Sequence, residues 1–316
     1  MKRFFGMLIG GWLTTLSMGA SAAMPLVDVA WVKANLGKPG VVFLDVRGKL
    51  AGKSKADYLR GHIPGAIWTD YLKDGWRIKD GDGTVGMLPP VAKIEKLIGG
   101  LGIDNDAHVV IIPQGHKALD LATATRVYWT FKVLGDDNVS ILNGGMVAYT
   151  KDTDKKTNRP LNPLARGWVK LPPKTFKASL RKQMIASKAE VRKAIQSGVV
   201  LVDNRPNNQY LGVNRHPKAK RSGTIPGAKN LPENWFTRNG GGTFRDAAAL
   251  KTLYALAGVP TTGKKITFCN TGHWASLGWF VSNQLMGDKQ VTMYDGSMVQ
   301  WSADPSLPMQ SAVAVE

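Results

Sequence analysis

Apolar and polar positions follow two alternating patterns along most of the chain. Short runs of β-branched and apolar residues, within residues 41–47, 199–205 and 266–268, are typical of buried strands. Between such runs, apolar residues recur every three or four positions, as on one helix face, at residues 91–101, 120–134, 188–196 and 246–256. Strands that alternate with helices favour right-handed crossovers. The pattern therefore predicts the α/β class, with mainly parallel sheets covered by helices on both faces.

The chain also repeats itself. Val-Val-Phe-Leu-Asp-Val-Arg at residues 41–47 returns as Val-Val-Leu-Val-Asp-Asn-Arg at 199–205. Gly-His-Ile-Pro-Gly-Ala at 61–66 returns as Gly-Thr-Ile-Pro-Gly-Ala at 223–228. In a third pair, residues 138–145 and 290–297, an apolar strand ends in a polar residue and glycine. Three matches in the same order predict the duplication of a whole domain.

The duplication divides the chain into segments. We expect one domain at residues 23–150 and a second domain at residues 178–316. Residues 151–177 are predicted to be the linker, because they are rich in Lys, Asn, Arg and Pro and lack periodicity. Ser187 and Glu190 have the spacing of a capping box, which predicts the start of the second domain's first helix.

Residues 1–22 have the three parts of an export signal peptide. Lys2 and Arg3 are basic, residues 4–18 are apolar, and Ala-Ser-Ala at residues 20–22 fits a cleavage site. The apolar run is short and contains Gly and Thr, which argues against a membrane anchor, and no later segment is apolar enough to span a bilayer. We therefore expect a periplasmic or secreted protein after signal cleavage, without stable membrane insertion.

The charge balance narrows the range of partners. The chain has 42 Lys and Arg against 23 Asp and Glu, a formal charge of +19. Such a surplus is typical of proteins that meet nucleic acid, an anionic membrane surface or anionic substrates, and export argues against nucleic acid. The five histidines lack metal-ligand spacing with one another or with the lone cysteine, so no metal site is expected.

The single cysteine, Cys269, lies where a strand meets a helix. Residues 266–268 suit a buried strand, and Leu277, Phe280, Val281 and Leu285 recur as on a helix face. Cys269 is therefore expected at the carboxyl end of a strand, below a helix N-terminus whose free N–H groups and dipole stabilise an anion such as a thiolate. Without this setting, a lone cysteine is more simply a small buried hydrophobe.

Only one half of the repeat has this nucleophile. Aligned on the preceding strands, Pro113 of the first half stands where Cys269 stands in the second. A feature found in both halves serves the scaffold, whereas a feature of one half is a candidate for chemistry. We therefore expect the first half to be a supporting domain that closes over the second.

These features together resemble the tandem-domain rhodanese family of thiosulfate and 3-mercaptopyruvate sulfurtransferases, in its exported bacterial form. The resemblance rests on Asp-x-Arg at residues 45–47 and 203–205, the Gly-x-Ile-Pro-Gly-Ala turn in both halves, and a cysteine loop in the second half only. It implies two tandem rhodanese-like domains and a persulfide intermediate on Cys269, chemistry that needs no metal or organic cofactor. It also implies an active-site loop whose amides surround the sulfur, formed by Cys269, Asn270, Thr271, Gly272, His273 and Trp274.

The subtype signatures of the family are not matched. Thiosulfate-type members usually carry basic residues just after the cysteine and mercaptopyruvate-type members carry Gly-Ser, whereas this chain has Asn270 and Thr271. A second arginine often follows Asp-x-Arg, and here its place is taken by Gln209. A phosphatase or arsenate reductase on the related scaffold is disfavoured, because the anion-clamping arginine that such an enzyme needs is replaced by Ala275.

Three basic residues are candidates for substrate binding: Arg205, Lys220 and Arg221. Arg205 either binds the donor or forms a structural ion pair, because Arg47 occupies the same place in the half without cysteine. The basic run at residues 215–221 either steers anions to the pocket mouth or is a solvated loop. His273 either stabilises the thiolate or meets an anion as a titrating imidazole, or it faces solvent.

The expected function is sulfur transfer from thiosulfate, in preference to 3-mercaptopyruvate, through a Cys269 persulfide. The partners implied are a small anionic sulfur donor and a cyanide or thiol acceptor. A non-catalytic carrier that delivers persulfide to a partner protein uses the same residues and stays open as the alternative. Repeated turnover with a small acceptor distinguishes the enzyme from the carrier.

Overall fold

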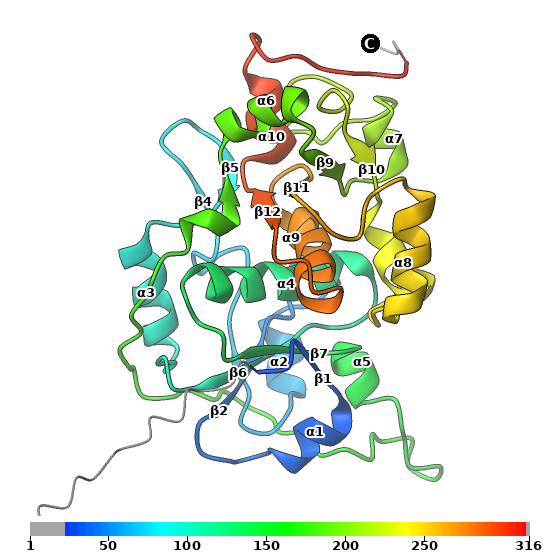
Figure 1. Cartoon of the computed structure of the whole chain (residues 1–316). Helices are drawn as coiled ribbons and strands as arrows, with labels where there is room; N and C mark the ends of the chain where they lie inside the picture. Colours follow the sequence, from blue (N-terminus) through cyan, green and yellow to red (C-terminus); the bar gives the residue numbers. More distant parts are fainter. Residues whose placement is uncertain (1–22, 314–316) are drawn as a thin grey trace, which may run out of the picture.

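The computed structural model describes residues 23–313, in which two halves of equal topology lie one above the other (Figure 1). The predicted signal peptide at residues 1–22 lies outside the described residues. Among the residues that the structure describes, no helix has the length and apolar character needed to cross a bilayer.

Each half contains a five-stranded parallel sheet. The first sheet has the order β1 (Leu26–Val27), β7 (Val139–Leu142), β6 (His108–Ile112), β2 (Val41–Asp45) and β3 (Ile67–Trp68). The second, read in the same direction, is β8 (Ile185–Ala186), β12 (Val291–Tyr294), β11 (Lys265–Phe268), β9 (Val200–Asp203) and β10 (Lys229–Asn230). The orders correspond strand for strand, which confirms the predicted fold class and the duplication.

Helices cover the sheets, and the four predicted from the apolar pattern are present within two residues of their expected ends. They are α3 (Val91–Gly100), α4 (Ala118–Val133), α6 (Lys188–Ser197) and α8 (Ala247–Leu256). The others are α1 (Val29–Ala34), α2 (Lys55–Arg60), α5 (Gly145–Tyr149), α7 (Asn207–Tyr210), α9 (His273–Phe280) and α10 (Ser297–Ala303). Helix α6 begins with the predicted capping box, in which Ser187 Oγ accepts from Glu190 N and Glu190 accepts from Ser187 N.

Shorter elements connect these. The 3₁₀ turns are η1 (Lys49–Ala51), η2 (Lys182–Met184), η3 (Glu233–Phe236) and η4 (Arg238–Gly240), and a π-helical turn, η5 (Val281–Leu285), continues α9. Strands β4 (Ile78–Lys79) and β5 (Val85–Met87) form an antiparallel hairpin in the first half. Residues 151–177 run between α5 and η2 and form only isolated bridges, such as that between His62 and Ala165.

One hydrophobic core joins the two halves. Helices α4 and α9 pack against each other at the centre of the molecule (Figure 1), and 15 of the 16 residues of α4 are buried. Thr125 Oγ1 of α4 lies 3.0 Å from Ser276 Oγ of α9. A helix that is buried all round must lie between layers, so α4 is the shared wall of both halves.

The duplicated Asp-x-Arg motif forms a buried ion pair in both halves. Arg205 Nη2 lies 2.6 Å from Asp203 Oδ2 and 2.8 Å from the carbonyl oxygen of Gly223, the first residue of the Gly-x-Ile-Pro-Gly-Ala turn. Arg47 makes the same contacts with Asp45, at 2.6 Å, and with Gly61, at 2.9 Å. The structural alternative for Arg205 is therefore the one observed. Its expected role as a substrate ligand is wrong, because its side chain is buried and bound to Asp203.

The repeat supplies a matched control for this correction. Replacing Arg205 by Met leaves the Asp203 carboxylate buried and without its partner, so we expect a loss of about 3–5 kcal/mol in the free energy of unfolding. Arg47→Met should cost a similar amount, measured by urea denaturation, because its surroundings are equivalent. A donor kcat/KM that falls tenfold more in folded Arg205→Met than in folded Arg47→Met would restore Arg205 as a substrate ligand.

Candidate active site

Cys269 lies where the sequence predicted, between a strand end and a helix start. Strand β11 ends at Phe268, and α9 begins at His273 after a loop of four residues. Cys269 is fully buried. Gly272 caps the helix with a φ of +71°, and a Cβ atom there would lie 2.4 Å from Arg126 Nη1 and 2.6 Å from Asp295 Oδ1. Both the backbone conformation and the close approach of these side chains require glycine.

A serine from α10 organises the loop. Ser297 Oγ accepts hydrogen bonds from the amides of Cys269 and Gly272, each at 3.1 Å. Ser297 adopts a φ of +49°, and the residue in its place in the first half is a glycine, Gly145, with a φ of +56°. A non-glycine residue in this region is strained, and the hydroxyl gives a reason to keep it. Within residues 23–313, no acceptor binds the amides of Asn270, Thr271 and His273, which leaves these N–H groups available to an anion.

The unusual loop residue Asn270 is linked to the unusual Gln209. Asn270 Nδ2 donates to Gln209 Oε1 at 2.8 Å, while Asn270 Oδ1 is buried and has no partner in the described part of the chain. The two departures from the family pattern are thus one paired feature. The neutral side chains of Asn270 and Gln209 therefore pair at the position where family members often have the second arginine.

Arginines of the first half hold the loop from the opposite side. Arg77, just before the β4–β5 hairpin, donates through Nη2 to Thr271 O at 2.6 Å. Arg126 of α4 donates to Gly272 O at 3.2 Å and to Asp295 Oδ1 at 2.5 Å. The carbonyl groups of Thr271 and Gly272 therefore point to cations of the first half. The N–H groups of the same two peptide units, those of Gly272 and His273, point away from these cations. The first half closes over the nucleophile, as the duplication argument expected.

His273 is held as a neutral imidazole. Its Nε2 lies 2.9 Å from the carbonyl oxygen of Leu119, which can only accept, so Nε2 carries the proton and Nδ1 accepts from Tyr71 Oη at 3.0 Å. Burial and the nearby charge of Arg77 lower its pKa to about 3. A charged His273 that stabilises the thiolate and a solvent-facing His273 are therefore both wrong, whereas contact with an anion in the cavity that it lines stays a prediction.

The site is a cavity of about 350 Å³ between the two halves. Its walls come from both, and its lining residues are Leu50, Leu72, Arg77, Leu119, His216, Cys269, Asn270, Thr271, His273 and Trp274. The cavity thus contains five of the six predicted loop residues, and Gly272 supports them from behind. Arg77 is its fixed cation, and no carboxylate pairs with Arg77 among the described residues.

The other two predicted substrate ligands lie elsewhere. The guanidinium of Arg221 donates to the carbonyl oxygens of Ser302, Asp304 and Leu307 at 2.9, 2.6 and 2.8 Å, and so closes the end of α10. Lys220 is exposed and does not line the cavity. The prediction was wrong for both, because backbone carbonyls rather than a ligand explain Arg221. Of the basic run, His216 reaches the cavity, and the sequence reasoning had not singled it out.

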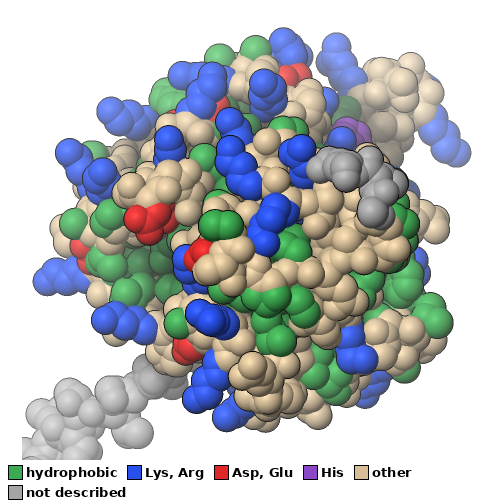
Figure 2. Space-filling view, turned by 90° about the horizontal axis from the view of Figure 1, so that it is seen from above, with side chains coloured by type: hydrophobic (Ala, Val, Ile, Leu, Met, Phe, Trp, Pro, Cys, Tyr) green, Lys and Arg blue, Asp and Glu red, His purple; other side chains and the backbone are tan. Residues whose placement is uncertain are grey.

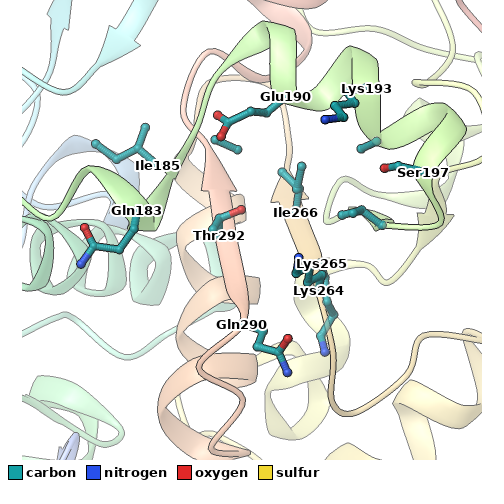
Figure 3. Close-up of a pocket in the computed structure, with 13 residues that line it drawn as sticks. Gln183, Ile185, Glu190, Lys193, Ser197, Lys264, Lys265, Ile266, Gln290 and Thr292 are labelled. Atoms are coloured by element: carbon teal, nitrogen blue, oxygen red, sulfur yellow. The ribbon is translucent and has the colours of Figure 1, made fainter.

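A second cleft, of about 560 Å³, lies at the opposite end of the second sheet (Figure 3). Lys264 and Gln290 at its edge precede β11 and β12, whereas Cys269 follows β11. In the first half, α1 contacts the start of β6 through Trp31, whose ring centroid lies 5.0 Å from that of His108. The second cleft contains no cysteine or histidine, so it offers no partner for the chemistry of Cys269.

Comparisons with known proteins agree with this geometry. The family model of the rhodanese-like domain matches the chain twice, at residues 28–152 and 187–304. Thiosulfate sulfurtransferase from Bos taurus is 32% identical over 288 residues, which cover 87% of this chain and 91% of that protein. The sulfur carrier protein TtuD from Thermus thermophilus is 30% identical over 304 residues, which cover 92% and 98%.

A solved structure shows the same architecture. SseA from Escherichia coli, a 3-mercaptopyruvate sulfurtransferase, superposes with a TM-score of 0.71 at 25% identity, covering 87% of this chain and 99% of SseA. Two family matches in one chain, placed on two sheets of one topology, account for the duplication seen in the sequence. The chain therefore belongs to the rhodanese family of sulfurtransferases and has two rhodanese-like domains in tandem.

Proposed function

We propose that the protein moves a sulfane sulfur from thiosulfate, or a related anionic donor, to cyanide or a thiol through a persulfide on Cys269. One observation carries the proposal. Cys269 is buried on the wall of a cavity that also contains loop N–H groups without an acceptor and the guanidinium of Arg77, which has no carboxylate partner among the described residues. Such a site stabilises both a thiolate and an anionic sulfur donor next to it.

The proposed reaction has two displacement steps. The Cys269 thiolate attacks the outer sulfur of thiosulfate, an Sγ–S bond forms, and sulfite leaves with the electron pair of the broken S–S bond. Cyanide or a thiolate then attacks the outer sulfur of the persulfide. The Sγ–S bond breaks, Cys269 becomes a thiolate again, and thiocyanate or a new persulfide is released.

The protonation states in the cavity favour thiosulfate over 3-mercaptopyruvate. Sulfite leaves as a stable anion, whereas breaking the C–S bond of 3-mercaptopyruvate leaves a carbanion equivalent that needs a proton. His273 is neutral, and burial together with the charge of Arg77 also lowers the pKa of His216. Neither imidazole that lines the cavity is therefore a ready acid at neutral pH, and the donor that needs no acid fits better.

Arg77 is the proposed ligand for the donor anion. It comes from the first half, lines the cavity beside Cys269, and uses Nε and one Nη2 hydrogen for Gly86 O and Thr271 O, at 3.1 and 2.6 Å. A guanidinium has five N–H donors, so these two bonds do not exhaust its capacity to bind a sulfonate group. This gives to the first half the role that the sequence analysis considered for Arg205, Lys220 and Arg221.

The alternative function is that of a persulfide carrier. The similarity to a sulfur carrier protein from Thermus thermophilus favours it, because a carrier uses the same cysteine loop. A carrier accepts one sulfur and then waits for its partner protein. An enzyme cycles with cyanide alone, so steady-state thiocyanate formation from thiosulfate and cyanide distinguishes the two.

Replacing the nucleophile tests the persulfide directly. Cys269→Ser should abolish thiocyanate formation and the gain of one sulfur in the intact mass after incubation with thiosulfate, because a serine hydroxyl cannot form the persulfide. The fold should be retained, since serine is close to cysteine in size. Turnover that persists in a folded Cys269→Ser protein would refute the mechanism.

Neutralising Arg77 tests donor recognition. Arg77→Gln keeps a side chain that can donate to Thr271 O but removes the charge, so kcat/KM for thiosulfate should fall about 10-fold to 100-fold, mainly through KM. Added salt should weaken thiosulfate binding less in this variant than in the wild type. Arg221→Gln is the matched control, and its KM should stay unchanged. Equal effects of the two substitutions would remove Arg77 from the donor site.

The neutral state of His273 predicts a pH dependence of stability. The unfolded chain takes up a proton at this position below about pH 6.5, whereas the folded protein does so only near pH 3. Because the folded pKa is lowered, the stabilisation is present above pH 6.5 and is lost as the pH falls toward 3. We expect the free energy of unfolding, measured by urea denaturation, to rise with pH between pH 4 and 7. This rise should be smaller in His273→Gln, by up to about 1.4 kcal/mol per pH unit. Parallel profiles would show that His273 titrates normally in the folded protein.

A further inference from the structure

A groove rich in lysine opens beside the catalytic cavity, and neither the reaction nor the fold requires it. It has a volume of about 590 Å³. Its lining residues, which we call the lysine groove, are Gly48, Lys49, Lys53, Ser54, Lys55, Ala56, Trp68, Asp70, Leu72, Lys73 and Asp74. All of them belong to the first half, the half without a nucleophile.

The groove has an excess of positive charge, because its four lysines outnumber its two carboxylates, Asp70 and Asp74. Asp74 Oδ2 already accepts from Thr69 Oγ1 at 2.8 Å and from Asp70 N at 2.7 Å, and Asp70 Oδ1 accepts from Leu72 N at 2.9 Å. These carboxylates shape the turn rather than pair with lysine. Among the described residues, none of the four groove lysines forms an ion pair, and Lys55 Nζ lies 4.1 Å above the ring of Trp168.

The groove adjoins the site of Cys269. Leu72 lines both the lysine groove and the catalytic cavity, and a third, smaller hollow shares Leu72 with both, Lys49 with the groove and Leu50 with the cavity. Leu72 is 44% exposed, so its side chain is open to contact from outside. An occupant of the groove would therefore contact an exposed apolar side chain at the rim of the active site.

The size and place of the groove identify the kind of occupant. Thiosulfate and cyanide are small enough for the catalytic cavity, so their binding does not need the additional volume of the lysine groove. A protein thiol, in contrast, must reach the buried sulfur of Cys269 from outside, so the residues next to it have to lie along this rim. Four unpaired lysines and an exposed leucine complement an extended segment with several carboxylates and an apolar residue.

We propose that the lysine groove binds an acidic segment of a thiol-bearing acceptor protein and so directs the sulfur of the Cys269 persulfide to that thiol. The inference rests on the proposed function and names its second substrate. In the transfer, the acceptor thiolate takes the outer sulfur and Cys269 is released as a thiolate, so no further reactant is needed.

The test must separate a local site from general attraction. Figure 2 shows one face of the molecule on which basic side chains are scattered, with few acidic ones between them. The second cleft provides a matched control, because Lys193 and Lys264 line a space of about 560 Å³ away from Cys269 (Figure 3). The groove variant is Lys49→Gln with Lys73→Gln, and the control variant is Lys193→Gln with Lys264→Gln. All four lysines are exposed.

The acceptors are two synthetic peptides that end in cysteine, one with four glutamates and one with four glutamines in their place. At low ionic strength, the wild type should transfer sulfur from thiosulfate to the glutamate peptide with about tenfold higher kcat/KM. The groove variant should lose about fivefold with this peptide and nothing with the glutamine peptide. The control variant should match the wild type, and turnover with cyanide should be equal in all three proteins.

Other outcomes would overturn the inference. Equal losses in the groove and control variants would mean that overall charge attracts the peptide, and no preference for glutamate would remove the acidic partner. If the groove variant lost only its binding to phosphatidylglycerol vesicles, the groove would be a membrane contact instead. Absence of cyanide turnover in the wild type would refute the proposed function separately, while fluorescence anisotropy of the labelled glutamate peptide would still measure binding to the groove.

Discussion

The buried ion pair between Arg126 and Asp295 is the interaction on which the arrangement of the site depends. Both side chains are buried; Arg126 belongs to the first half and Asp295 to the second. Arg126 also binds the carbonyl oxygens of Gly272 and Gly86, and Asp295 accepts from the amide of Leu88. One charge pair thus fixes the active loop, the β4–β5 hairpin and the shared helix α4 together. Removing either partner would leave an unpaired charge in the core, so the halves cannot separate without a large penalty.

Each half contacts the other through equivalent residues, and the residues proposed for chemistry are those in which the two halves differ. Asn143 Oδ1 accepts from the amide of Phe244 in the second half, just as Asp295 accepts from Leu88 in the first. The polar residue that ends this strand therefore has the same scaffold role twice. It is an aspartate only beside the cysteine loop, where it pairs with Arg126, and the serine that follows it in place of Gly145 binds two loop amides. The two halves share the same frame. At three positions of the site the second half differs from the first: Cys269 for Pro113, Asp295 for Asn143 and Ser297 for Gly145.

Local patterns in the sequence were enough for the frame and for the position of Cys269, but not for the walls of the cavity. The strand before Cys269, the loop, and the helix after it follow from neighbouring residues, and the repeat gave the second sheet. Arg77, Tyr71 and Leu119 reach the loop across a domain interface, and Arg77 is 194 residues from the carbonyl that it binds. Nothing in their local sequence indicates this contact. The opposite error concerned Arg221: a basic run does not show whether its donors meet solvent, an anion or, as here, the carbonyls at a helix end.

The requirement for the half without a nucleophile follows from electrostatics. Buried on its own, a thiolate is costly, and the second half contributes amides and neutral side chains to its surroundings but no fixed cation that lines the cavity. His273 cannot serve, since Leu119 and Tyr71 occupy both of its nitrogens and hold it neutral. The positive charge comes from Arg77, which the first half positions through Gly86 and which in turn fixes Thr271. The first domain is therefore part of the proposed active site rather than a remnant of duplication, and residues of both halves line the cavity.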